Sequence, residues 1–362
     1  MEQGTGVEPA FTAWEAVVLP IYEPCIVRII TDRIWKFKSF LSRAGRLKEK
    51  KCCVILYTIW NYLIRRGLRR ATFPKGEGLE GVVCMRFQKI YVEISNLCNL
   101  SCRFCPGTKR QGRRMTEAEF ASILLKLRSF TDYLYFHLMG EPLCHPLLGR
   151  FLEMAGEMGF RVILTTNGTL LQKQQELLLS APALHKVNIS LHAFEANDLQ
   201  MRFADYIDGC LSYGQAAQGK KLTVFRLWNQ GGENGQNEAI LQKLHNAFPG
   251  DWVQERPGIR IGDKVYLEHG DKFDWPDLSA PEGEVSFCYG LRDQLGILCD
   301  GSVVPCCLDH EGDLTLGNLF TEELSDILEK PRAKAIYGGF SQGRAVEELC
   351  RRCGYARRFA KK

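Results

Sequence analysis

Three closely spaced cysteines are the residues of this sequence most suited to chemistry. Cys98, Cys102 and Cys105 lie in the stretch SNLCNLSCRFCPGTKR, directly after a strand-like run. Thiolates bind zinc or iron–sulfur clusters, and a closed structural site normally uses four ligands. The next suitable side chains, Cys144 and His145, lie far along the chain. The spacing therefore favours a site with an open fourth position, which is typical of a catalytic metal centre.

A second group of cysteines, near the end of the chain, is large enough to close a metal site. Its predicted ligands are Cys288, Cys306, Cys350 and Cys353. Four thiolates would bind either zinc or a fully ligated [4Fe–4S] cluster. Cys307 is an alternative to Cys306 as the ligand, and Cys299 is expected to pack within a hairpin. The other cysteines are interpreted as structural, namely Cys25, Cys52, Cys53, Cys84, Cys144 and Cys210.

Strand-like and helix-like segments alternate from residue 89 onward and must position these groups. The strand-like runs are KIYVEIS, YLYFHLMG, RVILTTNG, KVNISLHA and KLTVFRLWN, which are rich in β-branched and aromatic residues. One intervening helix should begin with a capping box at Thr116 and Glu119, and another should end at Gly159. Such βαβ units predict a parallel sheet, barrel-like or doubly wound, with functional residues at the carboxyl ends of its strands. After residue 250 the alternation stops, and GILCDGSVVPCC predicts a hairpin turning at Asp300 and Gly301.

The composition is that of a globular protein of 362 residues, but 15 cysteines are unusual. Secreted proteins that use many cysteines as disulfides are usually short, and the first ten residues show no secretory signal. Clustered cysteines then favour metal binding in a reducing cytoplasm. The net charge of +5 is uneven, because residues 28–75 carry +12 and the rest of the chain therefore carries −7.

The basic residues belong to an N-terminal extension with two helix-like segments. In IVRIITDRIWKFKSFL the apolar residues fall near one helical face, and CCVILYTIWNYLI is a mostly apolar run between basic flanks. That run is too short for a membrane span, which needs about 20 residues. Residues 26–70 are interpreted either as a peripheral contact with the inner face of an anionic membrane or as a helical pair packed on the body. A third interpretation is a non-native extension, with translation starting at Met85.

The first cysteine group and the strands around it resemble the radical S-adenosylmethionine (SAM) superfamily over residues 87–353. The resemblance is carried by CxxxCxxC with Phe104 before the last cysteine, and by HLMGEPLCHP, TTNGTLL, NISLHA and FRLWN in family order. It implies a partial (β/α)6 TIM-like barrel whose three cysteines hold a [4Fe–4S] cluster. The open iron of that cluster would chelate the amino and carboxylate groups of SAM, which explains the missing fourth ligand.

The late cysteines are similar to the auxiliary-cluster domain called SPASM, or its shorter twitch form. The segments DGSVVPCC and CRRC carry this resemblance. It implies a second, auxiliary [4Fe–4S] cluster. Because only GYARRFAKK follows the last pair of cysteines, we expect one auxiliary cluster and the twitch form.

The resemblance also implies roles for individual residues at the ends of the strands. Gly140 and Glu141 match the family's glycine–glutamate motif, which meets the SAM amino group, although Gly140 could be a turn glycine and Glu141 a solvated carboxylate. Ser190 fits a contact with the ribose hydroxyls or a plain strand-end serine. Arg226 would pair with the SAM carboxylate or form a salt bridge with an acid of the barrel. Phe104 would lie beside adenine or pack in the protein. No catalytic base is assigned, because surface or structural roles are favoured for His192, Asp309 and His310.

The predicted organisation is a basic helical extension over residues 1–86, a radical SAM barrel over 87–280 and an auxiliary cluster domain over 281–362. The predicted function is reductive cleavage of SAM to a 5′-deoxyadenosyl radical that removes a substrate hydrogen, with oxidation or bond formation on a small molecule, peptide or protein. An electron donor of the flavodoxin or ferredoxin type is the expected partner. The alternatives are an RNA-modifying enzyme of this superfamily, disfavoured because no RNA-binding module is present, and a zinc-stabilised binding protein without enzymatic activity.

Overall fold

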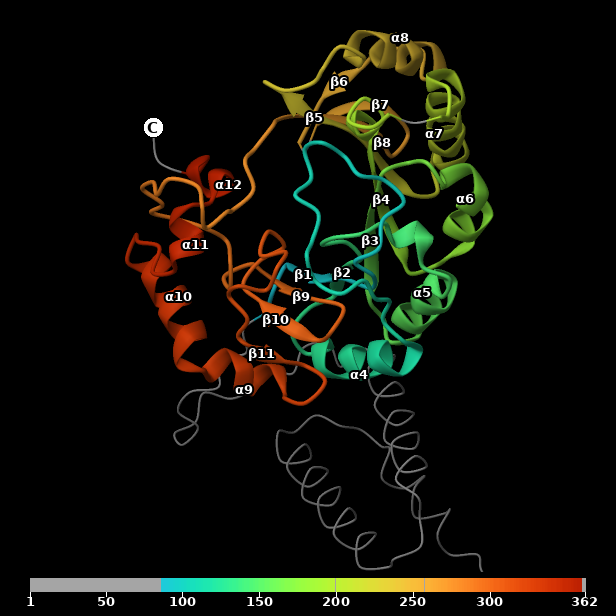
Figure 1. Cartoon of the computed structure of the whole chain (residues 1–362). Helices are drawn as coiled ribbons and strands as arrows, with labels where there is room; N and C mark the ends of the chain where they lie inside the picture. The colour runs from blue at the N-terminus through green and yellow to red at the C-terminus, as the bar shows by residue number, and fades with distance from the viewer. Residues whose placement is uncertain (1–85, 199, 257, 360–362) are drawn as a thin grey trace, which may run out of the picture. The chain divides into compact units, whose positions relative to one another are not determined.

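The computed structural model describes residues 86–198, 200–256 and 258–359 (Figure 1). The basic extension and its predicted membrane contact lie outside these residues. Within the described ranges, no helix combines the length and apolar character that crossing a membrane requires.

A single sheet of 11 strands is the frame of the described chain, in the order β11-β10-β9-β1-β2-β3-β4-β5-β8-β7-β6. Seven neighbouring strands, from β9 to β8 in this order, are paired in parallel. They are β9 (Gln294–Ile297), β1 (Lys89–Val92), β2 (Tyr133–Tyr135), β3 (Arg161–Thr166), β4 (Leu184–Ser190), β5 (Leu222–Gln230) and β8 (Val265–Asp271). The order follows the chain from β1 to β5, so each βαβ unit adds one strand to the sheet.

Helices between the strands cover the outer side of this curved sheet (Figure 1). They are α4 (Glu117–Leu127), α5 (Leu148–Glu157), α6 (Leu171–Ser180), α7 (Phe203–Ala217) and α8 (Asn237–Ala247), with short helices η1 (Pro142–Cys144) and η2 (Leu191–Ala193) after β2 and β4. The predicted capping box is confirmed, because Thr116 and Glu119 bond reciprocally at the start of α4. Gly159 follows α5 with φ +77°, which suits a glycine beyond a helix end.

The sheet continues after residue 250, which corrects the prediction that the alternation stops there. β8 pairs in parallel with β5 and is the sixth strand from β1 in the order of the sheet. Beyond β8 the sheet is extended by β7 (Ile259–Gly262) and β6 (Val253–Gln254), which pair in antiparallel fashion. The β8 run VYLEHGD contains charged residues, which obscured it as a strand. The chain reverses before it at Lys264, which has φ +60°.

The C-terminal segment joins the same sheet. β9 and β10 (Ser302–Val304) form the predicted hairpin, with Gly301 at φ +86°, and β9 lies parallel to β1. The segment ends in β11 (Gly317–Asn318) and in helices α9 (Leu324–Glu329), α10 (Pro331–Ser341), α11 (Glu348–Arg351) and α12 (Gly354–Arg357). The result is an open, partial barrel followed by a small cysteine-rich unit, which agrees with the predicted fold class.

Candidate functional site

The first cysteine group occupies the loop that follows β1, at the carboxyl end of the parallel strands. Cys98 is exposed, while Cys102 and Cys105 are partly buried. A turn with Cys105 N–H donating to Cys102 O at 2.9 Å brings the last two together. Partial burial and, to a smaller extent, the nearby Glu141, Cys102 and Cys105 raise the pKa of Cys98 to about 11. These thiols are therefore protonated until a metal displaces the protons.

Amide groups from the cysteine loop itself and from neighbouring loops point at these sulfurs. Asn197 Nδ2 donates to Cys102 Sγ at 3.1 Å, and Leu100 N–H donates to Cys98 Sγ at 3.4 Å. Asn167 Nδ2, from the turn after β3, lies 3.9 Å from Cys98 Sγ. Hydrogen bonds of this kind stabilise thiolates and tune iron–sulfur clusters. The donor set therefore fits an iron–sulfur cluster held by three cysteines.

The three thiols lie close together on the loop, but they are not arranged around a common metal position. Across the described residues, no three cysteine, histidine or acidic side chains are already arranged as a metal-binding group. A hollow of about 460 Å³ adjoins Cys98 and is lined in part by Arg103, Asn197 and Asp198. Arg103 pairs with Glu233 at 2.8 Å and so ties the cysteine loop to the segment after β5.

Gly140 and Glu141 form the turn after β2 and pack directly on the cysteine loop. Gly140 has φ +75°, and a Cβ at this position would collide with the carbonyl oxygen of Ser95. Glu141 N–H donates to Leu97 O at 2.9 Å. Glu141 is 2% exposed, and burial raises the pKa of its carboxyl group to about 7.

Both oxygens of the Glu141 carboxylate already accept backbone hydrogen bonds. Oε1 accepts from Leu143 N–H at 2.9 Å, and Oε2 accepts from Asn167 N–H at 2.8 Å. The alternative of a solvated carboxylate is therefore wrong. A contact between Glu141 and the SAM amino group stays a prediction, and it would have to share these oxygens.

Phe104 and Ser190 lie around the loop that follows β4. The Phe104 ring packs against His192, with 4.9 Å between ring centroids. Ser190 ends β4, and its carbonyl oxygen accepts from the Tyr206 hydroxyl at 3.3 Å. His192 is buried, with Nδ1 3.1 Å from Arg226 O, which supports a structural role for this histidine. The predicted contacts of Phe104 and Ser190 with SAM stay predictions.

Arg226 forms the salt bridge that the sequence left as an alternative. Its Nε lies 3.0 Å from Glu268 Oε2, and its guanidinium lies 4.6 Å from the centre of the Trp228 ring. Lys186 Nζ lies 3.8 Å from the other Glu268 oxygen. Two cations thus share one carboxylate in the interior of the barrel. A SAM carboxylate near Arg226 would add a second anion to this group.

The inner wall of the barrel carries polar residues that the sequence analysis did not name. His137, Thr165 and Asn188 stand side by side on the segments of β2, β3 and β4. Asn188 Nδ2 donates to Thr165 Oγ1 at 3.2 Å, and Thr165 Oγ1 lies 3.3 Å from His137 Nε2. The sequence pattern that could have identified them is the alternation of these polar residues with apolar ones such as Leu164 and Ile189, which are fully buried toward the helices.

The four predicted auxiliary ligands are neighbours in the structure. Burial raises the pKa of each thiol, and the proximity of Cys288 adds to the rise for Cys306, Cys350 and Cys353. Cys353 N–H donates to Cys350 O at 3.3 Å, which closes the CRRC turn. The donor set of four clustered thiols fits a fully ligated cluster.

Cys307 and Cys299 point to other partners. The Tyr91 hydroxyl of β1 donates to the Cys307 thiol, whose pKa burial raises to about 11. Cys307 also lies near Cys288, but its sulfur is engaged by Tyr91, whereas Cys306 has both Cys288 and Cys350 beside it, which supports Cys306 as the auxiliary ligand. Cys299 is buried near Arg110, at 3.8 Å, as expected for a packed hairpin residue. Asp309 is also buried, with its carboxylate accepting two backbone hydrogen bonds, from Asp313 and Leu314.

Comparison with known proteins decides the family. The profile of the radical SAM superfamily matches residues 92–242, and the SPASM profile, an iron–sulfur cluster-binding domain, matches residues 281–354. The S-adenosyl-L-methionine-dependent 2-deoxy-scyllo-inosamine dehydrogenase of Niallia circulans is 30% identical over 275 residues, which cover 74% of this chain and 92% of that protein. The chain belongs to the radical SAM superfamily.

Solved structures show the same fold at lower identity. BtrN in complex with AdoMet and 2-DOIA superposes with a TM-score of 0.51 at 21% identity, covering 74% of this chain and 92% of that one. Streptococcus suis SuiB bound to its precursor peptide SuiA gives 0.52 at 16% identity, covering 82% and 81%. At these identities the likeness shows the fold alone.

Membership in the superfamily confirms several predictions. The protein is a radical SAM enzyme of the oxidoreductase type with a C-terminal SPASM domain. Its cofactors are SAM, the [4Fe–4S] cluster that binds SAM, and auxiliary iron–sulfur chemistry held by the SPASM domain, which is an iron–sulfur cluster-binding domain. This result favours the enzyme over the zinc-stabilised binding protein. A single auxiliary cluster stays a prediction.

Proposed function

We propose that this enzyme oxidises a small polar molecule inside the barrel, and that an auxiliary cluster held by the C-terminal cysteines would accept the electron that the oxidation releases. The observation that carries the proposal is the set of four clustered thiols, Cys288, Cys306, Cys350 and Cys353. A cluster with four protein ligands has no open position for substrate, so electron transfer is the role left to it. Electron uptake is what the oxidation of a substrate radical requires.

The position of the auxiliary segment supports this role. Cys307, next to the proposed ligand Cys306, is hydrogen-bonded to Tyr91 of β1. The Tyr91 ring in turn lies 5.0 Å from the ring of Tyr135 and 5.2 Å from that of His137, both on the inner wall. The auxiliary segment is therefore packed directly against the barrel interior.

The side chains of the inner wall favour a small polar substrate. The ion group of Lys186, Arg226 and Glu268 and the bonded row from His137 to Asn188 give this wall charges and hydrogen-bonding groups. The Niallia circulans relative is a dehydrogenase whose name gives an aminocyclitol as its substrate. Both observations support a hydroxyl-bearing small molecule ahead of a peptide.

When bound, the SAM-binding cluster supplies the electron that cleaves SAM to the 5′-deoxyadenosyl radical. The chain supplies the remaining functions. Cys98, Cys102 and Cys105 hold the cluster, Glu141 joins the turns beside it, and the barrel wall orients substrate and excludes water. Gly140, Ser190, Arg226 and Phe104 are the proposed neighbours of SAM.

The test is deuterium transfer from defined substrates. Anaerobic enzyme with SAM and dithionite is incubated with perdeuterated inositols and aminocyclitols, and in parallel with deuterated peptides. We expect deuterium in 5′-deoxyadenosine from a small alcohol, together with a ketone product. Deuterium transfer from peptides alone, or a product at the oxidation level of the substrate, would contradict the proposal.

A further inference from the structure

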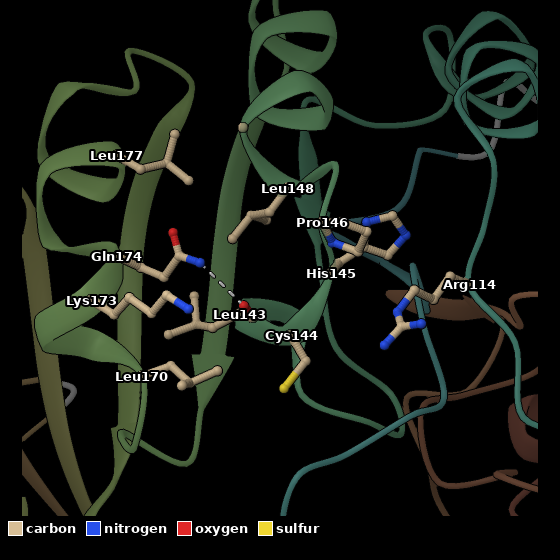
Figure 2. Close-up of a pocket in the computed structure, with 11 residues that line it drawn as sticks. Arg114, Leu143, Cys144, His145, Pro146, Leu148, Leu170, Lys173, Gln174 and Leu177 are labelled. Atoms are coloured by element: carbon tan, nitrogen blue, oxygen red, sulfur yellow. Dashed lines mark hydrogen bonds between the residues drawn. The ribbon is translucent and has the colours of Figure 1, made fainter.

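A second hollow lies on the outer surface beside the cysteine loop, between η1, the start of α5 and helix α6 (Figure 2). Its volume is about 380 Å³. In Figure 2, Arg114, Cys144 and Lys173 border the same space from three different segments. Gln174 donates to Leu143 O at 3.4 Å and so ties α6 to η1 behind it.

One lining residue of this hollow, Cys144, is hydrogen-bonded to the loop that carries the first three cysteines. The backbone N–H of Asn99, next to Cys98, donates to the Cys144 thiol. Asn99 Nδ2 also donates to Thr169 Oγ1 at 2.8 Å, just before α6 begins. A molecule seated in the hollow would therefore be separated from the cluster-binding loop by Cys144, which is hydrogen-bonded to Asn99.

The charge of the hollow is positive and unbalanced. Its lining includes no aspartate or glutamate, and within the described residues no carboxylate lies within salt-bridge distance of Arg114 or Lys173. Most other basic side chains of this part of the chain are paired. Arg113, the preceding residue, contacts Glu119 at 2.6 Å, and Arg150 on α5 contacts Glu117 at 2.8 Å.

Two free cations in one hollow favour an acidic partner. Residues 86–359 contain 31 Lys and Arg against 34 Asp and Glu, a net charge of −3. This part of the chain is weakly acidic, so within it a local positive patch is the place that favours docking of an acidic protein. Because the hollow lies beside the cluster-binding loop, a partner docked there would be placed to transfer electrons to the cluster.

We propose that this hollow docks the acidic electron-transfer protein, of the flavodoxin or ferredoxin type, that reduces the cluster held by Cys98, Cys102 and Cys105. One electron leaves the reduced donor, which is oxidised by one electron, and enters the cluster through the loop around Asn99. The proposal rests on the proposed function, because it assumes a cluster that must be reduced.

The test compares a protein donor with a chemical reductant. The variant Arg114→Glu/Lys173→Glu removes the positive charge, and Lys220→Glu is the control. Lys220 is exposed and lies before β5, at the amino end of the parallel strands and opposite the cysteine loop. Release of 5′-deoxyadenosine from SAM is measured with dithionite and, separately, with reduced flavodoxin or ferredoxin at several concentrations and salt levels.

The double variant is expected to need at least about tenfold more protein donor for half-maximal rate, while its dithionite-driven rate and iron content match wild type. The wild-type rate with protein donor should fall with salt, and Lys220→Glu should behave as wild type. An unchanged donor requirement would overturn the docking proposal. If wild type released no 5′-deoxyadenosine with dithionite, that result would instead contradict the proposed function.

Two further measurements address the cases in which the double variant is misfolded or in which the hollow binds a small anion instead of a protein. If the double variant loses iron, Arg114→Gln/Lys173→Gln removes the charges without reversing them and is expected to show the same selective loss. Binding of inorganic phosphate to wild type is measured by calorimetry. Tight phosphate binding that the variant abolishes, with no change in the donor-driven rate, would assign the hollow to a small anion and overturn the proposal.

Discussion

Glu141 Oε2 accepts a hydrogen bond of 2.8 Å from the backbone N–H of Asn167, so a buried carboxylate joins the turn after β2 to the turn after β3. Its other oxygen holds Leu143 N–H at the start of η1. Asn167 in turn directs its amide toward Cys98 Sγ. The glutamate of the family motif thus acts in this chain as a brace between the loops that surround the cysteines.

At pH 8, where the Glu141 carboxyl group is ionised, Glu141→Gln is expected to destabilise the fold by about 2 to 3 kcal/mol. The glutamine NH₂ group would face one of two backbone N–H donors, so a buried hydrogen bond to a charged group is lost and a donor is left unpaired. The free energy of unfolding in guanidinium measures the effect. Glu153→Gln, on the exposed face of α5, is the control and should change stability by less than about 0.5 kcal/mol. Equal effects of the two substitutions would contradict the brace.

Glu141 also gives stability an unusual dependence on pH. Burial raises its pKa from 4.5 to about 7, so the folded state holds the proton more tightly than the unfolded state. The stability contributed by this group is present below pH 4.5 and is lost as the pH rises toward 7. Between pH 6 and 8, wild type should lose about 1 kcal/mol more than Glu141→Gln. Denaturant unfolding at both pH values measures this difference, and a wild-type gain in stability relative to the variant would contradict it.

Asn197→Ala is expected to lower the reduction potential of the SAM-binding cluster. The amide of Asn197 donates to Cys102 Sγ at 3.1 Å and stabilises negative charge on the sulfur, which favours the reduced state. Loss of about 1 kcal/mol corresponds to about 40 mV for a one-electron couple. A redox titration followed by electron paramagnetic resonance measures the potential. Asn237→Ala, on α8, is the control, and a potential unchanged in Asn197→Ala would refute the assignment.

Cys306→Ser and Cys307→Ser should have different effects on iron content. Cys306 lies near both Cys288 and Cys350, whereas Cys307, although also near Cys288, is hydrogen-bonded to Tyr91. Cys306→Ser is expected to lose the iron of the auxiliary cluster, and Cys307→Ser to keep it. Iron analysis after anaerobic reconstitution decides between them. Loss of iron in Cys307→Ser alone would assign the ligand to Cys307.

Local patterns predicted the elements of the fold better than the contacts between them. The capping box at Thr116 and the hairpin at Gly301 depend on residues a few positions apart, and both are present. Strand β8 was missed because its identity as a strand depends on pairing with β5. That pairing places Arg226 opposite Glu268, 42 residues away, which the sequence could not decide.

The candidate site shows the same difference between local sequence patterns and contacts between distant residues. The spacing of Cys98, Cys102 and Cys105 is local, so the sequence was sufficient to propose the cluster. The amides of Asn167 and Asn197 reach the sulfurs from other loops, and the row from His137 to Asn188 forms only when β2, β3 and β4 lie in register. Such partners become visible only once the sheet is assembled.

Anaerobic reconstitution, with iron content and 5′-deoxyadenosine release measured together, is the most direct test of the central claim. Wild type is compared with the triple variant Cys98→Ala/Cys102→Ala/Cys105→Ala and with Cys350→Ala/Cys353→Ala. We expect about eight irons per chain in wild type, half of them lost in each variant, and cleavage of SAM abolished in the triple variant. Zinc in place of iron, without release of 5′-deoxyadenosine, would show that the cysteines are structural and that this chain does not perform radical chemistry.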